Sequence, residues 1–374
     1  MLPPSVDAKP AHPLTPYPRG WYLAAHADEV AVRQVVPLRL FGRDLVVFRT
    51  DDGRAHITDA HCPHLGAHLG HGGRVTGECV RCPFHGWEFE ADTGACVRTA
   101  NGDPPPPTAR LRTWEVDEQN GMILVWFHER GEPPTWHVPV FPAFDDPTWS
   151  RWSTTSWILR ARIQDVSEND ADVAHSPAMH GFTDGQPSIE MDTEGARCTY
   201  TLRAKIRLSA YGAPTLPAIG PIGPIEPMLP ITIETLRWGL SLGWIRQWTE
   251  LPFGLTLTTQ TLGTTTPVDP DHVRVTFRHR VPKLPLPGAT RVLLRQYARL
   301  FDRTAGEDVP IWENKVYRMR PVASRSDWAI LRFRRWARQF YDPDHWDAAM
   351  SHELAAGERT HQPAGPSPHA PSPA

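Results

Sequence analysis

The sequence predicts an α+β protein with two domains. Between Gly20 and about His128, short apolar runs alternate with turn residues, which is typical of a small all-β domain. The Pro-rich stretch "RGEPPTWHVPVFPAFDDP" follows and is typical of a linker. In the later segment "ATRVLLRQYARLF", Leu293, Tyr297 and Leu300 recur at helical spacing. We therefore expect an all-β domain followed by a domain of strands with one long helix.

Hairpins account for the first domain. The segments "VVPLRLF" and "RDLVVFRT" alternate apolar and polar residues, and "DDG" at 51–53 makes the turn into the next strand. A second hairpin, "WEFEADTGACVR", turns at 92–94. The apolar run "GMILVWF" (121–127) is expected to close the domain as a buried strand.

The second domain begins with the strand-like "WSTTSWILRARI" and then changes to helical composition in "DVSENDADVAHSPAMHG". The strands "RCTYTLRAKIRL" and "HVRVTFRHRV" come next, before the long helix. Phe301 extends the apolar face of that helix. Its opposite face carries a basic stripe that we expect to be solvated: Arg291, Arg295, Arg299 and Arg303.

Composition limits the class of protein. A chain of 374 residues with 40% apolar residues and a net charge of −3 fits a soluble globular protein of two domains, with no sign of nucleic-acid binding. The N-terminus (1–18) is expected to be flexible and contains neither a signal peptide nor a membrane span, which favours the cytoplasm. The tail (357–374) is expected to be disordered.

Three of the five cysteines lie among histidines, which favours metal binding over disulfides. Four of these residues follow the spacing C-x-H-x17-C-x2-H: Cys62, His64, Cys82 and His85. Zinc fingers usually pair their two cysteines in one arm, whereas each arm here contributes one cysteine and one histidine. That order favours a diiron cluster in which one iron takes two thiolates and the other two imidazoles, with structural zinc as the alternative.

The stretch "CPHLGAHLGHGG…CPFHGWEF" resembles the Rieske [2Fe–2S] signature. Rieske proteins of respiratory complexes carry an extra cysteine in each loop, and this chain has Ala67 and Trp87 there. The resemblance is therefore to oxygenase-type and ferredoxin-type Rieske domains. Because four ligands complete the cluster, His68 and His71 are expected to lie beside it without binding iron.

A second group of ligands lies downstream. Asp172 and His175 share one face of the expected helix with Glu168. Pro177 is expected to break that helix at the preceding residue, so that His180 can share a metal with His175.

Two histidines need a carboxylate to complete the facial triad of non-haem Fe(II) oxygenases. Asp308 in "GEDVPIWENK" is the expected third ligand, and its neighbour Glu307 is the alternative.

With both groups of ligands, the chain resembles the α-subunits of Rieske non-haem iron oxygenases from about Tyr17 to Tyr341. "PRGWYLAA", "ENDADVAH" and "FRRWARQFY" are similar to the cholesterol 7-desaturase and 3-ketosteroid 9α-hydroxylase group. The resemblance implies a Rieske domain at 19–135 and a helix-grip catalytic domain with an antiparallel sheet at 136–350. It also implies the family pattern of an acidic or amide residue (Glu168 or Asn169), a bridging Asp172 and the two histidine ligands.

The resemblance further implies the reaction. Electrons from NAD(P)H would arrive through a reductase, with or without a ferredoxin, and O2 would be used to hydroxylate or desaturate a C–H bond of an apolar, steroid-like or lipid-like substrate. In a head-to-tail homotrimer, Asp172 would link the iron of one subunit to His85 of the partner subunit. A secondary-metabolite oxygenase that performs cyclisation or hydroxylation remains an alternative, as does an electron-transfer or ligand-binding protein without oxygenase chemistry.

One segment bears on the substrate. Residues 208–244 are apolar and carry few charges, so they fit either a lid over a long pocket or a structural loop. Phe182 and Trp238 are candidates for lining the cavity.

Overall fold

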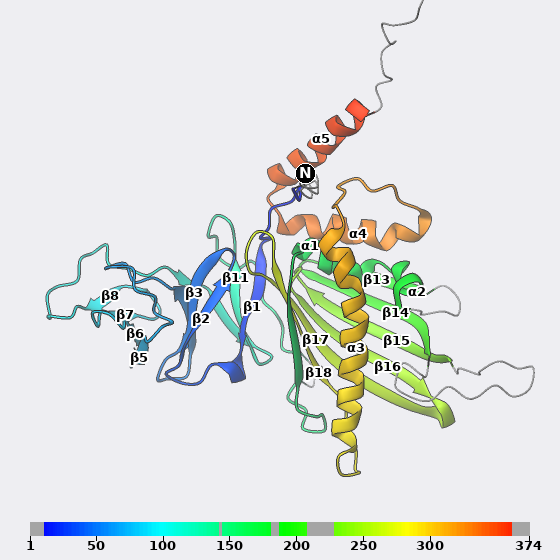
Figure 1. Cartoon of the computed structure of the whole chain (residues 1–374), viewed down its shortest axis with the longest axis horizontal. Helices are drawn as coiled ribbons and strands as arrows, with labels where there is room; N and C mark the ends of the chain where they lie inside the picture. Colours follow the sequence, from blue (N-terminus) through cyan, green and yellow to red (C-terminus); the bar gives the residue numbers. More distant parts are fainter. Residues whose placement is uncertain (1–10, 142–143, 181–186, 208–227, 361–374) are drawn as a thin grey trace, which may run out of the picture.

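The computed structural model describes residues 11–141, 144–180, 187–207 and 228–360, with side chains described to residue 353. Small antiparallel sheets form the N-terminal part, and one seven-stranded antiparallel sheet with helices forms the C-terminal part (Figure 1). The α+β fold predicted from the sequence is therefore confirmed.

The N-terminal part contains three small sheets. The first has the order β1 (Gly20–His26), β11 (Met122–Phe127), β10 (Val116–Gln119). The second has the order β2 (Val35–Leu40), β3 (Arg43–Arg49), β4 (Ala55–Asp59), β9 (Thr113–Trp114). The third has the order β5 (Arg74–Thr76), β6 (Cys79–Arg81), β7 (Glu88–Glu90), β8 (Cys96–Arg98), and a short 3₁₀ turn, η1 (Ala27–Glu29), follows β1. Both predicted hairpins are present, as β3–β4 and β7–β8.

The large sheet has the order β12-β18-β17-β16-β15-β14-β13. Its strands are β12 (Ser153–Leu159), β13 (Ser188–Glu194), β14 (Arg197–Arg207), β15 (Met228–Trp238), β16 (Leu242–Leu251), β17 (Leu255–Pro267) and β18 (Val273–Arg280). Between β12 and β13 lie α1 (Ile163–Ser167), η2 (Glu168–Ala171) and α2 (His175–His180). The long helix α3 (Ala289–Asn314) runs along one face of this sheet (Figure 1). The remaining helices are α4 (Trp328–Ala337) and α5 (Pro343–Thr360), and the short turns are η4 (Pro252–Gly254), η5 (Arg325–Asp327) and η6 (Arg338–Phe340).

Helix α3 is longer than the sequence pattern predicted. We expected it over 289–301, and it continues to Asn314 because Asp308 and Trp312 extend its buried face beyond Phe301. The basic stripe is exposed, as predicted. As a result, Asp308 lies on the helix that covers the sheet.

Residues near both ends of the chain are more ordered than we predicted. Leu14 is buried, and the ring of Tyr17 lies 5.6 Å from that of Phe127, so residues 11–18 are packed instead of flexible. Helix α5 runs to Thr360, past the expected start of the disordered tail at 357. Apolar contacts with the folded chain order residues 11–18, although their composition predicted flexibility. Residues 1–10 and 361–374 lie outside the described residues.

The two parts share an apolar interface. Trp21 of β1 and Trp126 of β11 belong to one buried cluster with Trp244 of β16. Trp136, from the Pro-rich connection, packs on Trp126, and its carbonyl accepts a hydrogen bond of 2.7 Å from Trp21 Nε1. The connection is therefore packed between the parts and fixes how they meet.

Candidate metal centres and substrate cavity

The two Cys–His loops have the same backbone conformation. In residues 62–67, Cys62 N donates to Ala67 O (2.9 Å) and its own carbonyl accepts from Gly66 N (2.9 Å). Residues 82–87 repeat this pattern, with Cys82 N to Trp87 O at 2.8 Å and Gly86 N to Cys82 O at 3.1 Å. Gly66 and Gly86 have φ of +77° and +70°, which explains why each loop needs glycine there.

Each loop presents one thiol and one imidazole. Cys62 and Cys82 are both buried, and the rings of His64 and His85 lie 4.8 Å apart. Burial, reinforced by the neighbouring Cys82, raises the pKa of the Cys62 thiol to about 11. A thiolate at this position therefore needs a bound cation, which fits a metal site.

The ligand atoms of these loops are not gathered as closely as those of a site for one metal ion. Among the described residues, one group of three His, Cys, Asp or Glu has its ligand atoms within 4.8 Å of one another, and it is not in these loops. Ligands spread more widely suit a cluster of two metals better than a tetrahedral zinc ion. The structural-zinc alternative loses its support.

The converging group consists of His175, His180 and Asp308. Asp308 Oδ1 lies 3.4 Å from His180 Nε2 and 3.9 Å from His175 Nε2. The histidines come from α2 and the carboxylate from α3, and the side chains of His180 and Asp308 are 5% and 8% exposed. Two imidazoles and one carboxylate on one side of a cavity are the donor set of a facial-triad iron site.

The helical conformation is interrupted before His175 and not at Ser176. The prediction that Glu168, Asp172 and His175 share one helical face is therefore wrong. Asp172 leaves helical geometry (φ −87°, ψ 86°), and its Oδ1 accepts a hydrogen bond from His175 N at 3.3 Å. Pro177 lies in the first turn of α2, where a helix needs no N–H from it. Both histidines therefore lie on α2.

Asn169, and not Glu168, lies at the candidate iron site. Asn169 Nδ2 donates to Asp308 Oδ2 at 3.0 Å and lies 3.4 Å from His175 Nε2. The carboxylate of Glu168 instead accepts from Arg334 (3.0 Å) and Lys315 (3.2 Å). The sequence pattern left these two residues open because they are adjacent, and a 3₁₀ turn points them in different directions.

Glu307 contacts the outer nitrogen of His180. Its Oε2 lies 2.9 Å from His180 Nδ1, on the side of the ring opposite to the nitrogen that faces Asp308. Burial lowers the pKa of His180, but the carboxylates of Asp308 and Glu307 outweigh it and raise the pKa overall. Glu307 is thus placed to orient the imidazole while Asp308 faces the site.

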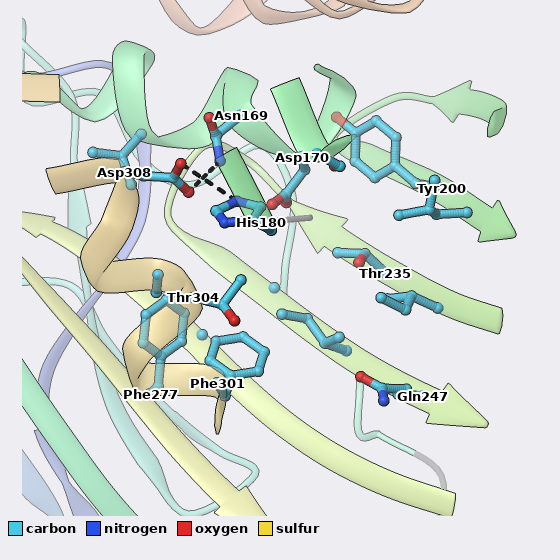
Figure 2. Close-up of a pocket in the computed structure, with 18 of the residues that line it drawn as sticks. Asn169, Asp170, His180, Tyr200, Thr235, Gln247, Phe277, Phe301, Thr304 and Asp308 are labelled. Atoms are coloured by element: carbon cyan, nitrogen blue, oxygen red, sulfur yellow. Dashed lines mark hydrogen bonds and ion pairs between the residues drawn. The ribbon is translucent and has the colours of Figure 1, made fainter. Parts of the chain in front are cut away.

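A cavity of about 220 Å³ opens beside this group, between α3 and the large sheet (Figure 2). Apolar residues that line it include Leu202, Ile231, Ile233, Ile245, Phe277 and Phe301. Gly243 and Gly263 pair across β16 and β17 and also line it. The cavity suits a ligand that is mainly apolar.

Two expectations about the cavity change. Trp238 is not among its lining residues, because its ring packs on Phe141 with 5.1 Å between centroids. Of the segment 208–244 predicted to be a lid or a loop, residues 228–244 instead form β15 and the beginning of β16 in the large sheet. Phe182 and residues 208–227 lie outside the described residues. Polar residues that the sequence pattern did not single out also line the cavity, Thr235, Gln247 and Arg237 among them, and no spacing motif marks them.

Comparison with known families agrees with this geometry. Residues 20–115 match the Rieske [2Fe-2S] domain, and residues 125–341 match the 3-ketosteroid 9alpha-hydroxylase C-terminal domain. The chain belongs to the Rieske oxygenases. Within that family it falls in the group of cholesterol 7-desaturase and 3-ketosteroid 9α-hydroxylase.

Individual relatives place this Rieske oxygenase more closely. It is 31% identical to cholesterol 7-desaturase nvd of Xenopus laevis over 342 residues, which cover 87% of this chain and 72% of that protein. It is 27% identical to a "Probable 3-ketosteroid-9-alpha-monooxygenase, oxygenase component" of Rhodococcus rhodochrous, covering 87% and 80%. The structure of dicamba monooxygenase bound to dicamba shares the fold, with a TM-score of 0.65 at 18% identity over 86% of this chain and 96% of that one.

The match to the Rieske [2Fe-2S] domain supports a [2Fe–2S] cluster in this oxygenase. In the described part of the chain, no helix is long and apolar enough to cross a membrane.

Proposed function

We propose that this Rieske oxygenase oxidises a C–H bond of an apolar, polycyclic, steroid-like substrate with O2. The observation that carries the proposal is the convergence of His175, His180 and Asp308 at one end of an apolar cavity. A ligand in that cavity would present a C–H bond to the candidate metal. Hydroxylation, desaturation and oxidative cyclisation all begin from this arrangement.

In this proposal His175, His180 and Asp308 hold the mononuclear iron, and the other two iron ions are held by Cys62, His64, Cys82 and His85. When bound, the cluster supplies electrons one at a time and the mononuclear iron supplies the place where O2 is reduced. The chain's own residues prepare the site. Asn169 fixes the Asp308 carboxylate through its 3.0 Å hydrogen bond, and the apolar walls exclude water.

Further proposals concern partners. A reductase, with or without a ferredoxin, would supply NAD(P)H electrons to the cluster, and the name of the Rhodococcus relative, an oxygenase component, supports a separate electron donor. Asp172 is one-third exposed and caps α2 beside the iron ligands, so a homotrimer could bring His85 of the partner subunit to it. The absence of cysteine pairs among the described residues is compatible with the cytoplasm.

The names of the relatives support a steroid substrate, since both describe proteins that act on steroids. The cavity supports it independently through its apolar walls between a helix and a sheet. A secondary metabolite with a comparable ring system would fit the same walls.

Metal content and one variant test the proposal. The purified oxygenase should contain about 3 Fe per chain with acid-labile sulfide, whereas an electron carrier without the mononuclear site would hold about 2. His175→Ala should keep the cluster's visible and EPR spectra, lose about one Fe, and abolish product formation with a reductase and O2. Unchanged turnover by this variant would show that His175 is not an iron ligand.

Mass spectrometry then identifies the reaction. Steroid extracts incubated with wild type and with His175→Ala should differ by a product that has gained one oxygen or lost two hydrogens. A product with both changes would indicate a cyclisation or a sequence of two oxidations.

A further inference from the structure

Two exposed apolar projections extend from the large sheet. The hairpin between β16 and β17 exposes Phe253 almost completely (99%), and the following residue but one, Leu255, is also exposed. The connection from β18 to α3 exposes Leu284 and, to 71%, Leu286. Large apolar side chains that gather on a surface mark a place of contact with another molecule.

Both projections lie at the end of the sheet that is distant from the candidate iron. In the antiparallel pair of β17 and β18, Gln260 lies opposite Arg280, so the start of β17 and the end of β18 share one end of the sheet. Figure 1 shows α3 beginning at this end, where β16 also ends. Gln247, near the end of β16, lies at the opposite end of the pocket from His180 and Asp308 (Figure 2).

Apolar packing connects the hairpin with the cavity. Leu251, at the base of the hairpin, packs on a buried cluster of Ile206, Leu229 and Ile231. Leu300 of α3 packs on the same cluster. Ile206, Ile231 and Leu300 also line the cavity. Apolar side chains therefore lead from the exposed hairpin to the cavity wall.

Cations lie beside the second projection. From Lys283 to Phe301 the sequence has no acidic residue and four cations, which are Lys283, Arg291, Arg295 and Arg299. All four are exposed, and no carboxylate of the described residues forms an ion pair with them. The next arginine of the stripe, Arg303, instead lies 3.9 Å from Glu307. This part of the surface is therefore positively charged as well as apolar.

This combination fits the surface of an anionic lipid bilayer. Val292 is exposed among the arginines and borders an open apolar groove that Leu286 and Leu293 also line. Arginines beside apolar residues on a helix are typical of segments that lie at the boundary between lipid headgroups and hydrocarbon. Lipid phosphates attract the cations there. A protein that donates electrons would instead have to approach the Cys–His loops, which lie in the other domain.

We propose that the end of the large sheet distant from the candidate iron binds the surface of an anionic lipid bilayer. Phe253 and Leu286 enter the hydrocarbon, and Arg291 and Arg295 contact lipid phosphates. An apolar substrate dissolved in the bilayer then reaches the cavity along the cluster around Leu251. Lipid binding is argued from these residues alone, whereas delivery of the substrate rests on the proposed function.

Flotation of the intact holoenzyme with vesicles tests lipid binding without any substrate. Vesicles of equal amounts of phosphatidylcholine and phosphatidylglycerol should bind the wild type about tenfold more tightly than phosphatidylcholine alone. Arg291→Gln combined with Arg295→Gln should weaken binding to the anionic vesicles about 30-fold. Phe253→Ser combined with Leu286→Ser should weaken it about tenfold, because both variants lose contact with hydrocarbon.

Matched double variants are the controls. Arg43 and Arg74 are exposed cations of the N-terminal part and form no ion pair within the described ranges, so Arg43→Gln with Arg74→Gln removes the same charge elsewhere. Val140 and Val322 are exposed apolar residues of other connections, so Val140→Ser with Val322→Ser controls for the loss of apolar surface. Both controls should bind vesicles like the wild type, and the cluster spectrum should show that every variant is folded.

Three results would overturn the inference. The first is no binding of the wild type to the anionic vesicles, and the second is equal binding to both kinds of vesicle. The third is binding that depends on Arg291 and Arg295 but not on Phe253 and Leu286, which would assign this surface to an acidic protein.

Turnover separates this inference from the proposed function. With a steroid supplied in anionic vesicles, Phe253→Ser with Leu286→Ser should raise the KM about tenfold at an unchanged kcat, in proportion to the lost vesicle binding. With the same steroid carried by cyclodextrin, the KM should equal that of the wild type. An equal rise in both assays would overturn the delivery of substrate from the bilayer. If the holoenzyme floats with anionic vesicles and oxidises no steroid, lipid binding is upheld while the proposed substrate class fails.

Discussion

His180 is held by a carboxylate on each of its two nitrogens. Asp308 Oδ1 lies 3.4 Å from Nε2, and Glu307 Oε2 lies 2.9 Å from Nδ1. A carboxylate behind a metal-binding imidazole fixes the ring's orientation and makes its other nitrogen a better ligand. Two consecutive acidic residues therefore have different tasks.

Replacing Glu307 should weaken iron binding and leave the cluster intact. We expect Glu307→Ala to lower the affinity for the mononuclear iron by about 10- to 100-fold, and Glu307→Gln to lose less because it keeps an acceptor. Iron retained after dialysis against a chelator measures this. Glu194→Gln, on the exposed β13, is the control. Equal iron retention by Glu307→Ala and wild type would contradict this role.

His26 is buried in the first sheet, at the end of β1. It is 2% exposed, and within the described ranges neither ring nitrogen has a hydrogen-bond partner. Burial, with a smaller contribution from the nearby Arg278, lowers the pKa of His26 to about 4. The folded protein therefore holds this imidazole neutral.

Acid should destabilise the protein through His26. Between pH 6.5 and pH 4 the unfolded chain binds a proton that the folded chain does not, so this group's contribution is complete above pH 6.5 and is lost as the pH falls. From pH 7 to pH 5 we expect a loss of about 2 kcal/mol in the free energy of unfolding. Urea denaturation at both pH values measures it. His26→Leu should reduce the loss by that amount, and an equal loss in this variant would exclude His26 as the source.

The turn η2 is fastened to the large sheet. Arg237 of β15 donates to Asp170 through Nε (3.0 Å) and Nη2, and to Leu240 O through Nη1 (2.9 Å). Asp170 directly follows Asn169, whose amide holds Asp308. Because Arg237 is 8% exposed, this ion pair is shielded from water and fixes the turn more firmly than a surface pair would.

Breaking this pair should disturb the mononuclear iron from a distance. In Arg237→Gln, the turn loses its anchor and Asn169 loses its fixed position, so we expect lower iron retention and an altered EPR signal of the nitrosyl adduct. The Rieske EPR signal should not change. Arg246→Gln, which breaks the half-exposed pair with Glu234, is the matched control. Identical nitrosyl spectra for Arg237→Gln and wild type would show that Arg237 does not position the site.

Across the molecule, the two candidate metal centres lie in different parts of one chain. The sheet β5–β8, which flanks the Cys–His loops, lies at one end of the long axis, and α2 lies beyond α3 on the other side (Figure 1). Leu65 and Phe84, at the tips of the two loops, are 65% and 63% exposed. These exposed apolar tips suit contact with another protein, as the proposed electron transfer between subunits would require.

Mixed oligomers test that path. Cys62→Ser should inactivate the cluster and His175→Ala the mononuclear iron, so each variant alone should have no turnover. If electrons cross between subunits, coexpression with two affinity tags should give mixed oligomers with part of the wild-type turnover. Wild type carrying both tags provides the reference value. Inactive mixed oligomers would place electron transfer within one chain and contradict the proposed trimer.

We propose a boundary between the two domains near residue 135. β11 ends at Phe127 and pairs with β1, so it belongs with the first domain. Trp136 then packs on Trp126 from the connection. Because Trp136 of this connection packs with residues of both domains, the two domains are in direct contact there.

The amino-acid pattern was enough to predict the local features. Alternating apolar residues predict the hairpins, and the helical spacing of Leu293, Tyr297 and Leu300 predicts the long helix, because these periods follow from backbone geometry. The order of Cys62, His64, Cys82 and His85 predicts a two-iron cluster, since ligand types and spacing lie within two short loops.

Contacts between residues far apart in the sequence could be identified only from the folded structure. Asp308 lies far along the sequence from His180, and only the packing of α3 on the sheet brings its oxygen within 3.4 Å of the imidazole while directing Glu307 to the other nitrogen. Likewise, neighbours such as Glu168 and Asn169 are separated by a 3₁₀ turn that no spacing rule anticipates. Thr261 of β17, His279 of β18 and Tyr297 of α3 likewise come within hydrogen-bond distance only once the sheet and α3 have packed together.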